Sequence, residues 1–214
     1  MQDIQKTAAN ANSWVVGPGI GRGEFISKHL LEILGYFEGK LILLDADALW
    51  ILHEEGKRAK GAKSLSAVLG EVAKKNTLVL TPNEIELARL LQAFVDEKST
   101  PEEVREFGQS LYDYSAKDIY SRLSVEEAQS VAKHFDKVKK LMDGVGILLI
   151  KGQADIVFGR SVEVWRGQSG LKRCGGQGDV LGGLCSLYGY WAKEKGDVER
   201  GLIMACAVTR EASS

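Results

Sequence analysis

The segment LILLDADALW (residues 41–50) indicates how the chain folds, because an aliphatic run ends abruptly at two closely spaced carboxylates. Outward from it, SWVVG (13–17) and TLVLT (77–81) are short apolar runs of the same kind. Helical stretches follow these runs, at about 23–37, up to about 75, and at about 84–95. Such alternation is typical of parallel strands joined by helices. We therefore expect an α/β domain with a mainly parallel sheet.

The C-terminal half continues the pattern less regularly. Residues 96–123 are charged and weakly patterned, which predicts a surface excursion. Ser124 and Glu127 have the spacing of a capping box, and an amphipathic helix is expected to follow them to about residue 142. GILLIKG (146–152) indicates a buried strand, and the alternating runs around Gly159-Arg160 favour a β-hairpin. Two helices rich in small residues, suited to close packing, are expected to end the chain.

Composition excludes several classes of function. The 214 residues carry 28 Lys and Arg against 29 Asp and Glu, so a broad footprint for nucleic acid or membrane is not expected. The three cysteines lack metal-ligand spacing and fit free thiols in a reducing compartment. No apolar run is long enough to span a bilayer, and the N-terminus has no secretory layout. We expect a cytoplasmic protein; a mitochondrial form would need an N-terminal extension.

Each predicted strand is followed by glycines or ionisable residues. They are GPGIGR (17–22), Asp45 with Asp47, TPNEIE (81–86), and IKGQAD (150–155). Each has a plain structural alternative: a turn for the first, a helix cap for Asp45, Asp47 or Asn83, and a solvated side chain for Lys151. Two carboxylates in line could also hold a hydrated magnesium ion. Because ligands of parallel sheets bind beyond the carboxyl ends of the strands, we expect these groups to converge on phosphate and hydroxyl groups.

The segment KRCGGQGDVLGG (172–183) places glycines and one carboxylate, Asp179, before an apolar segment with helical spacing. A helix is expected to start at about Asp179, with free amides at its N-terminus that favour an anion. The alternative is that Asp179 only caps this helix and the glycines only make a turn.

Taken in order and spacing, VVGPGIGR, LLDADALW, LTPNEIELARL, IKGQAD and RCGGQGDVLGG resemble the signature segments of the ATP- or ADP-dependent NAD(P)H-hydrate dehydratases. The resemblance runs from about Trp14 to Arg210 and is strongest to the eukaryotic, ATP-using branch. It implies an α/β, ribokinase-like three-layer sandwich with a mainly parallel central sheet. It also implies a repair reaction in which hydrated NADH or NADPH (NADHX, NADPHX) is dehydrated to NADH or NADPH with ATP as co-substrate and Mg²⁺ as its counterion.

The same resemblance implies the site. Asp179 would be the catalytic residue and would also contact the substrate. The other substrate contacts would be Gly19, Gly21, Asn83, Glu84, Ile85, Glu86, Leu87, Ala88 and Arg89. The ATP contacts would be Lys151, Gly152, Gln153, Ala154, Asp155, Ser169, Gly170, Leu171, Lys172, Arg173, Cys174, Gly175, Gly176, Gln177 and Gly178. No residue is assigned directly to a metal, and Asp45 and Asp47 would support the site.

The chain also departs from the family pattern. The glycine-rich strand and helix that usually precede VVGPGIGR, and a further C-terminal helix, are not present. We therefore expect residues 1–214 to be a single truncated domain whose exposed sheet edge invites association, so that a homo-oligomer is an alternative to a monomer. Two rival functions remain: a ribokinase-like small-molecule kinase of the hydroxyethylthiazole kinase type, and a truncated, non-catalytic nucleotide-binding protein.

Overall fold

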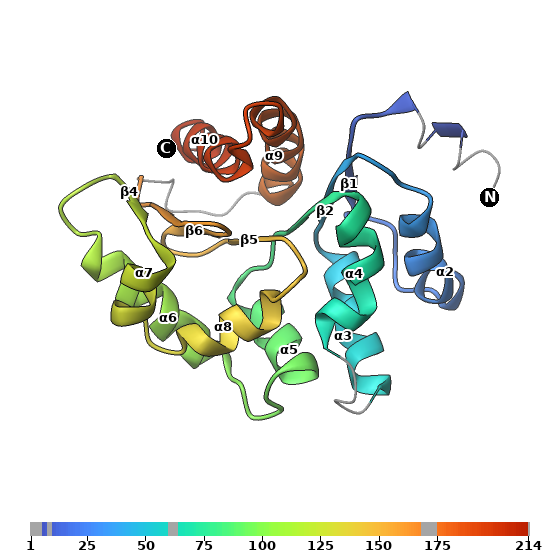
Figure 1. Ribbon diagram of the computed structural model, residues 1–214, viewed down its shortest axis with the longest axis horizontal. Helices are drawn as coiled ribbons and strands as arrows, with labels where there is room; N and C mark the ends of the chain where they lie inside the picture. Colours follow the sequence, from blue (N-terminus) through green and yellow to red (C-terminus); the bar gives the residue numbers. More distant parts are fainter. Residues whose placement is uncertain (1–5, 8–9, 60–63, 168–174, 214) are drawn as a thin grey trace.

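A single mixed sheet forms the centre of the molecule. The computed structural model describes residues 6–7, 10–59, 64–167 and 175–213, and within them seven strands are hydrogen-bonded in the order β1-β2-β3-β5-β6-β7-β4. Helices cover both faces of this sheet, with α9 and α10 on one side and the other helices on the opposite side (Figure 1). The expected α/β three-layer sandwich is confirmed.

The parallel half of the sheet follows the predicted alternation. Strands β1, β2, β3 and β5 pair in parallel. The pairing of β1 with β2, and of β2 with β3, runs along all four residues of each strand. The elements of this half, in chain order, are β1 (Ser13–Val16), α2 (Glu24–Gly35), β2 (Leu41–Leu44), α3 (Asp47–Arg58), α4 (Leu65–Lys75), β3 (Thr77–Leu80), α5 (Glu84–Phe94) and β5 (Ile147–Ile150).

Strand β2 shows why the sheet needs helices on both faces. Its four aliphatic side chains are all fully buried, and successive side chains of a strand point to opposite faces. Ile42 and Leu44 belong to the larger core under α2 to α8, whereas Leu41 and Leu43 belong to the core under α9 and α10. A strand that is apolar on both faces is stable only between two layers.

The other half of the sheet is antiparallel. β6 (Asp155–Phe158) and β7 (Val162–Trp165) form the predicted hairpin, and β6 pairs with β5 in antiparallel orientation. The edge strand, β4 (Tyr120–Leu123), pairs with β7. Parallel pairing is therefore confined to the half of the sheet that β1, β2, β3 and β5 form.

The expectation of a surface excursion at residues 96–123 was wrong. This segment supplies β4 and a regular helix, α6 (Pro101–Tyr114), whose Val104, Phe107 and Leu111 are buried in the core. Thr100 caps the helix by accepting a hydrogen bond from the Glu103 amide, 3.3 Å away, and Pro101 occupies the first turn. The helix was missed because its apolar residues, although spaced by three and four positions, stand among many charged residues.

The predicted capping box is confirmed, but the helix after it is interrupted. Ser124 and Glu127 exchange both hydrogen bonds at the start of α7 (Val125–Val131). A second helix, α8 (Phe135–Met142), starts after His134, which has a left-handed backbone with φ of 59°. The break turns Phe135 into the core, where it is 2% exposed and packs between Phe107 and Phe158.

Helices α9 (Gln177–Lys193) and α10 (Val198–Glu211) cover the second face. α9 runs against the direction of the strands: Gly182 lies beside Val15, whereas Ser186, further along, donates to the Ser13 hydroxyl at 2.8 Å. The N-terminus of α9 therefore points to the carboxyl edge of the parallel strands. The helix begins at Gln177, two residues before the predicted start at Asp179.

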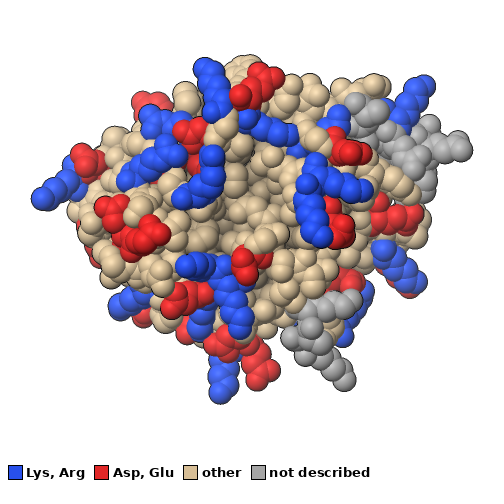
Figure 2. All heavy atoms as spheres, viewed as in Figure 1, with Lys and Arg blue, Asp and Glu red and all other residues tan. Residues whose placement is uncertain are grey.

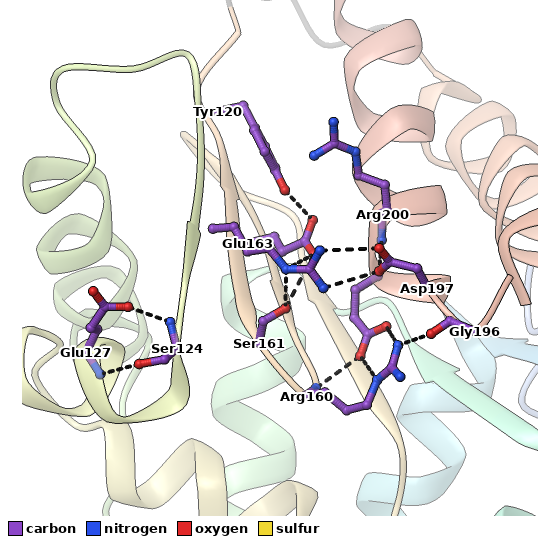
Figure 3. A network of polar contacts seen from close by, with 11 residues as sticks. Tyr120, Ser124, Glu127, Arg160, Ser161, Glu163, Gly196, Asp197 and Arg200 are labelled. Carbon is purple, nitrogen blue, oxygen red and sulfur yellow. Dashed lines mark hydrogen bonds and ion pairs between the residues drawn. The ribbon is translucent and has the colours of Figure 1, made fainter.

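A polar network ties the N-terminus of α10 to the antiparallel strands (Figure 3). Glu163 of β7 is fully buried and accepts a hydrogen bond from the Tyr120 hydroxyl at 3.1 Å. Arg122 lies 3.4 Å from Glu163 and 3.2 Å from Asp197, which precedes α10. A second pair, Arg160 with Glu199, joins the hairpin turn to the first turn of α10 at 3.0 Å. The network lies at the edge opposite the carboxyl ends of the parallel strands.

Gly201 allows α10 to lie directly against α9. A Cβ atom at this position would stand 2.5 Å from the Tyr188 carbonyl oxygen and 2.8 Å from the Ala192 Cβ. We expect Gly201→Ala to lower the free energy of unfolding by about 1–3 kcal/mol, because the backbone of α9 must move to make room. Gly183→Ala is the matched control, since its Cβ would enter open space; it should be neutral or stabilise the helix by up to about 1 kcal/mol. Urea unfolding measures both, and equal effects would contradict the packing argument.

The Glu163 network predicts an unusual pH dependence. Burial raises the pKa of the Glu163 carboxyl above its ordinary value of 4.5, opposed by the Arg122 guanidinium and the Tyr120 hydroxyl. Just above pH 4.5 the folded chain then keeps a proton that the unfolded chain has lost, so the contribution of Glu163 to stability falls as pH rises. Glu163→Gln has no such titration. Its free energy of unfolding relative to wild type should therefore increase with pH through this window.

Glu199→Gln serves as the control of opposite sign. Burial opposes ionisation of Glu199, but its hydrogen bonds from Arg160 prevail and leave its pKa below 4.5. Its contribution to stability is present above pH 4.5 and is lost as pH falls through the lowered value. Relative to wild type, Glu199→Gln should therefore lose stability as pH rises. Urea unfolding at a series of pH values measures both differences, and parallel curves would contradict the assignment.

Candidate active site

Backbone contacts hold the carboxyl ends of the parallel strands together. At one of these contacts only a glycine fits. Gly17, directly after β1, has a φ of 134°, and a Cβ there would overlap the carbonyl oxygen of Asp45. The Asp45 amide donates to the Val16 carbonyl at 3.0 Å, and the Thr81 amide donates to the Leu44 carbonyl at 3.1 Å. The first turns after β1, β2 and β3 are consequently adjacent.

Asp45 and Lys151 form an ion pair across this edge. The Lys151 ammonium lies 2.7 Å from the Asp45 Oδ1, and the two side chains are 21% and 5% exposed. The Lys151 amide also donates to the Pro82 carbonyl at 2.9 Å, and the backbones of Lys151 and Asn83 form an isolated parallel β-bridge. Lys151 is therefore not the solvated lysine of the plain alternative: it joins the end of β5 to the ends of β2 and β3.

Asp47 holds the glycine loop after β1 in place. Its carboxylate accepts hydrogen bonds from the Gly21 amide at 3.1 Å and from Arg22 Nε at 2.8 Å. Gly19 and Gly21 both have left-handed φ angles, 68° and 78°, and a Cβ at either would meet no atom of the described part of the chain within 4 Å beyond its chain neighbours. The N-cap of α3 is Ala46, without a side-chain capping bond, so the alternative that Asp45 or Asp47 caps this helix was wrong.

Asn83 and Glu86 form a capping box at the start of α5. The Asn83 side chain accepts from the amides of Ile85 and Glu86 at 3.0 Å, and Glu86 accepts from the Asn83 amide at 2.9 Å. Capping of α5 is therefore sufficient to explain why Asn83 and Glu86 occupy these positions, with or without a ligand. The neighbouring Glu84 is paired with Arg105 of α6 at 3.0 Å.

The other residues of this segment differ in what they present to a ligand. Ile85 is 53% exposed and Arg89 is also exposed, whereas Leu87 and Ala88 are buried in the core. Leu87 and Ala88 present no surface to a ligand in this conformation, so their part in the site would be to hold the first turn of α5 against the sheet.

The N-terminus of α9 carries the open glycine loop. Its N-cap is Gly176, which has a left-handed φ of 84° and makes no side-chain capping bond, so Asp179 is not the cap of this helix. Gly175, Gly176, Gly178 and Asp179 are exposed, and, the adjoining backbone aside, none of the described residues lies within 4 Å of where a Cβ would stand at any of the three glycines. The first amides of a helix lack intrahelical acceptors and favour an anion.

The direction of α9 brings Asp179 to the shared edge. Asp179 lies three residues before Gly182, which packs beside Val15 near the end of β1. At a rise of about 1.5 Å per residue, Asp179 is about one turn beyond that point, toward the Gly17 loop. The predicted ATP contacts Ser169, Gly170, Leu171, Lys172, Arg173 and Cys174 lie outside the described residues.

The predicted contacts of the β5–β6 loop occupy one turn between the two strands. Asp155 begins β6, is 4% exposed, and pairs with Arg210 of α10 at 2.6 Å. Gly152, Gln153 and Ala154 line a cavity of about 290 Å³ together with Glu84. Predicted substrate and nucleotide contacts therefore border the same space.

Sequence reasoning missed the wall of this cavity that α6 provides. Arg105, Gln109 and Tyr112 line it, and Ile150 and Ile156 of the sheet give it an apolar side. The signal that could have identified the helix was Thr100-Pro101-Glu102-Glu103, which combines an N-cap residue, proline in the first turn and early acidic residues. The many charged residues of segment 96–123 obscured this helix signal.

The carboxylates near the strand ends do not form a ready-made metal cage. Asp45 is paired with Lys151 and Asp47 with Arg22, so each already has a cationic partner. Within the described ranges, no three His, Cys, Asp or Glu side chains converge as metal ligands. These residues do not fit a resident Mg²⁺. Magnesium commonly reaches such sites bound to the phosphates of its nucleotide.

Positive and negative side chains are interspersed on the face seen in Figure 2, consistent with the net charge of −1. None of the helices in the described part of the chain is both long and apolar enough to cross a bilayer.

Fold and site together define a ribokinase-like α/β protein with an open helix N-terminus at the carboxyl edge of its parallel strands. The carbohydrate kinase family model described as NAD(P)H-hydrate dehydratase matches residues 1–214, and the chain belongs to this family.

Curated relatives agree with this assignment. An ATP-dependent (S)-NAD(P)H-hydrate dehydratase of Mycosarcoma maydis is 31% identical over 90% of this chain and 43% of its own length. The protein of the same name from Rattus norvegicus is 26% identical over 99% of this chain and 53% of its own length. The chain thus spans about half the length of the curated relatives it matches.

A solved structure supports the fold alone. A hypothetical protein from Streptococcus mutans superposes with a TM-score of 0.60 at 14% identity, covering 98% of this chain and 59% of its own.

The buried position of Asp45 predicts the effect of removing its partner. Lys151→Met should lower the free energy of unfolding by about 3–5 kcal/mol, because it leaves an uncompensated carboxylate in the interior. The double variant Asp45→Asn with Lys151→Met lacks that charge and should recover part of the loss. Chemical denaturation of both variants makes the comparison. A double variant less stable than Lys151→Met would show that the ion pair is not the cause.

Proposed function

We propose that this chain carries the catalytic machinery of an ATP-dependent (S)-NAD(P)H-hydrate dehydratase, which converts NADHX or NADPHX to NADH or NADPH. Family membership and the names of the curated relatives support the reaction. The observation that carries the proposal for the site is the direction of α9, which brings Asp179 and the open glycine amides to the edge where the parallel strands end.

The chemistry follows from what these groups can do. Asp179 would accept the proton of the ring hydroxyl as that oxygen attacks the terminal phosphoryl group of ATP. The amides around Gly175, Gly176 and Gly178 would stabilise the charge on the transferring group. ADP leaves, and the new ester then loses inorganic phosphate together with a proton from the adjacent ring carbon, which passes to solvent, so that the double bond of the nicotinamide ring is restored. Mg²⁺ would arrive with the triphosphate and neutralise part of its charge.

The two sides of the site would hold different ligands. Gly19, Gly21, Asn83–Glu86 and Arg89 would contact the hydrated dinucleotide, where Ile85 and Arg89 offer exposed side chains. The buried Leu87 and Ala88 would hold the turn in place. Lys151–Asp155 and Ser169–Gly178 would contact ATP. The cavity between Glu84 and Gly152–Ala154 supports this division, because the two sets of residues meet there.

The direct test supplies NADHX with ATP and follows the recovery of NADH absorbance. We expect NADH to appear with ATP and more slowly, or not at all, with ADP. A phosphorylated small molecule without NADH would instead support a hydroxyethylthiazole-type kinase. ATP binding without any turnover would support a non-catalytic nucleotide-binding protein.

Asp179→Asn separates chemistry from helix stability. Gly176 caps α9, so the substitution removes at most a favourable first-turn charge of about 0.3–1 kcal/mol. Loss of the proton acceptor should slow dehydration by about 10²–10⁴-fold. Steady-state rates, the melting temperature and ATP affinity should be measured together. Turnover within a few-fold of wild type would remove Asp179 from the mechanism and leave the glycines as a binding loop.

A further inference from the structure

Arg210, in the last turn of α10, contacts the β5–β6 turn proposed to bind ATP and the backbone just after β7. Its Nε donates to the Asp155 carboxylate at 2.6 Å, and its two terminal nitrogens donate to the Gly152 carbonyl at 2.8 Å and to the Gly167 carbonyl at 3.3 Å. Gly152 and Asp155 enclose the β5–β6 loop. Gly167 follows β7 and immediately precedes the residues that lead to the glycine motif.

The setting makes these contacts strong. Arg210 is 9% exposed, and the pair with Asp155 is buried. Burial opposes the charge of Arg210, but the hydrogen bond and the charge of Asp155 prevail and raise the pKa of the guanidinium. A planar guanidinium donates in several fixed directions at once, whereas a lysine ammonium acts as a point charge on a flexible stem. Three acceptors on two separate segments match an arginine specifically.

We propose that Arg210 is a positioning residue that fixes the turn Gly152–Asp155, which is proposed to bind ATP, relative to Gly167 after β7. It acts through Gly152, Asp155 and Gly167, without touching ATP itself. This proposal rests on the proposed ATP site. It assigns to the C-terminal helix a role in nucleotide binding that sequence motifs did not indicate, because Arg210 lies 55 residues from its carboxylate partner.

Two substitutions at Arg210 test the proposal. Arg210→Met removes all three contacts. Arg210→Lys keeps a positive charge beside Asp155, so the chain should fold, but one ammonium cannot hold both carbonyls in the same geometry. We expect KM for ATP to rise by about 10–100-fold in Arg210→Met and by less in Arg210→Lys, with a smaller change in kcat.

Arg160→Met is the matched control. Arg160 pairs with Glu199 in the first turn of the same helix and bonds the Gly196 carbonyl, at the opposite edge of the sheet. It should reduce stability without changing KM for ATP. If Arg160→Met raises KM as much as Arg210→Met at equal loss of stability, general loosening of α10 explains the effect and the proposal is overturned.

Amide hydrogen exchange provides a readout that needs no nucleotide. In the free chain, Arg210→Met and Arg210→Lys should speed exchange in residues 151–155 and 166–167 and leave the hairpin turn at 159–161 unchanged. Arg160→Met should speed exchange at 159–161 and leave residues 151–155 and 166–167 unchanged. Unchanged exchange at 151–155 in both Arg210 variants would overturn the proposal. If wild type fails to bind ATP, the proposed function fails, and exchange still decides the role of Arg210.

Discussion

The close contact of α9 with the sheet and with α10 determines where Asp179 and the glycines of α9 stand relative to the strand ends. Gly182 and Gly189 let α9 approach Val15 and Leu41, and Gly201 lets α10 approach the α9 backbone. Larger residues at these points would push α9 outward, and its N-terminus would move with it. The position of Asp179 is therefore set by packing far along the helix from the chemistry, because an α-helix transmits displacement along its axis as a stiff element.

The polar groups at the strand ends fix the geometry of the proposed site. A buried ion pair such as Asp45–Lys151 is costly to desolvate, and an apolar pair of the same volume is often at least as stable. What the ion pair does provide is a defined geometry, since it joins two strand ends 106 residues apart in sequence. Asp47 does the same for the Gly21 loop. Both carboxylates thereby hold the strand ends and the glycine loop in place.

Sequence alone could predict the parallel half of the sheet because its strands are continuous aliphatic runs with glycine or acidic residues directly after them. It could also place the capping box at Ser124 and offer a helix cap at Asn83, since these depend on residues only three positions apart. It failed for α6 and β4, where buried residues such as Phe107 are diluted by surface charges, and where the edge strand is defined by its pairing with β7. Contacts that depend on distant pairing, such as Arg210 with Asp155, leave no local pattern.

Helix α10 spans the whole height of the sheet, and its two ends are fixed by different means. At its N-terminus, Asp197 and Glu199 bind Arg122 and Arg160 in a network that is partly open to solvent. At its C-terminus, Arg210 is buried and all three of its contacts lie within or beside the proposed nucleotide segments. Exposed ion pairs contribute little to stability and weaken in salt, whereas buried ones are screened far less. The end of α10 beside the proposed nucleotide segments is therefore held by a pair whose two side chains are both buried, whereas the arginines that hold the hairpin end are exposed.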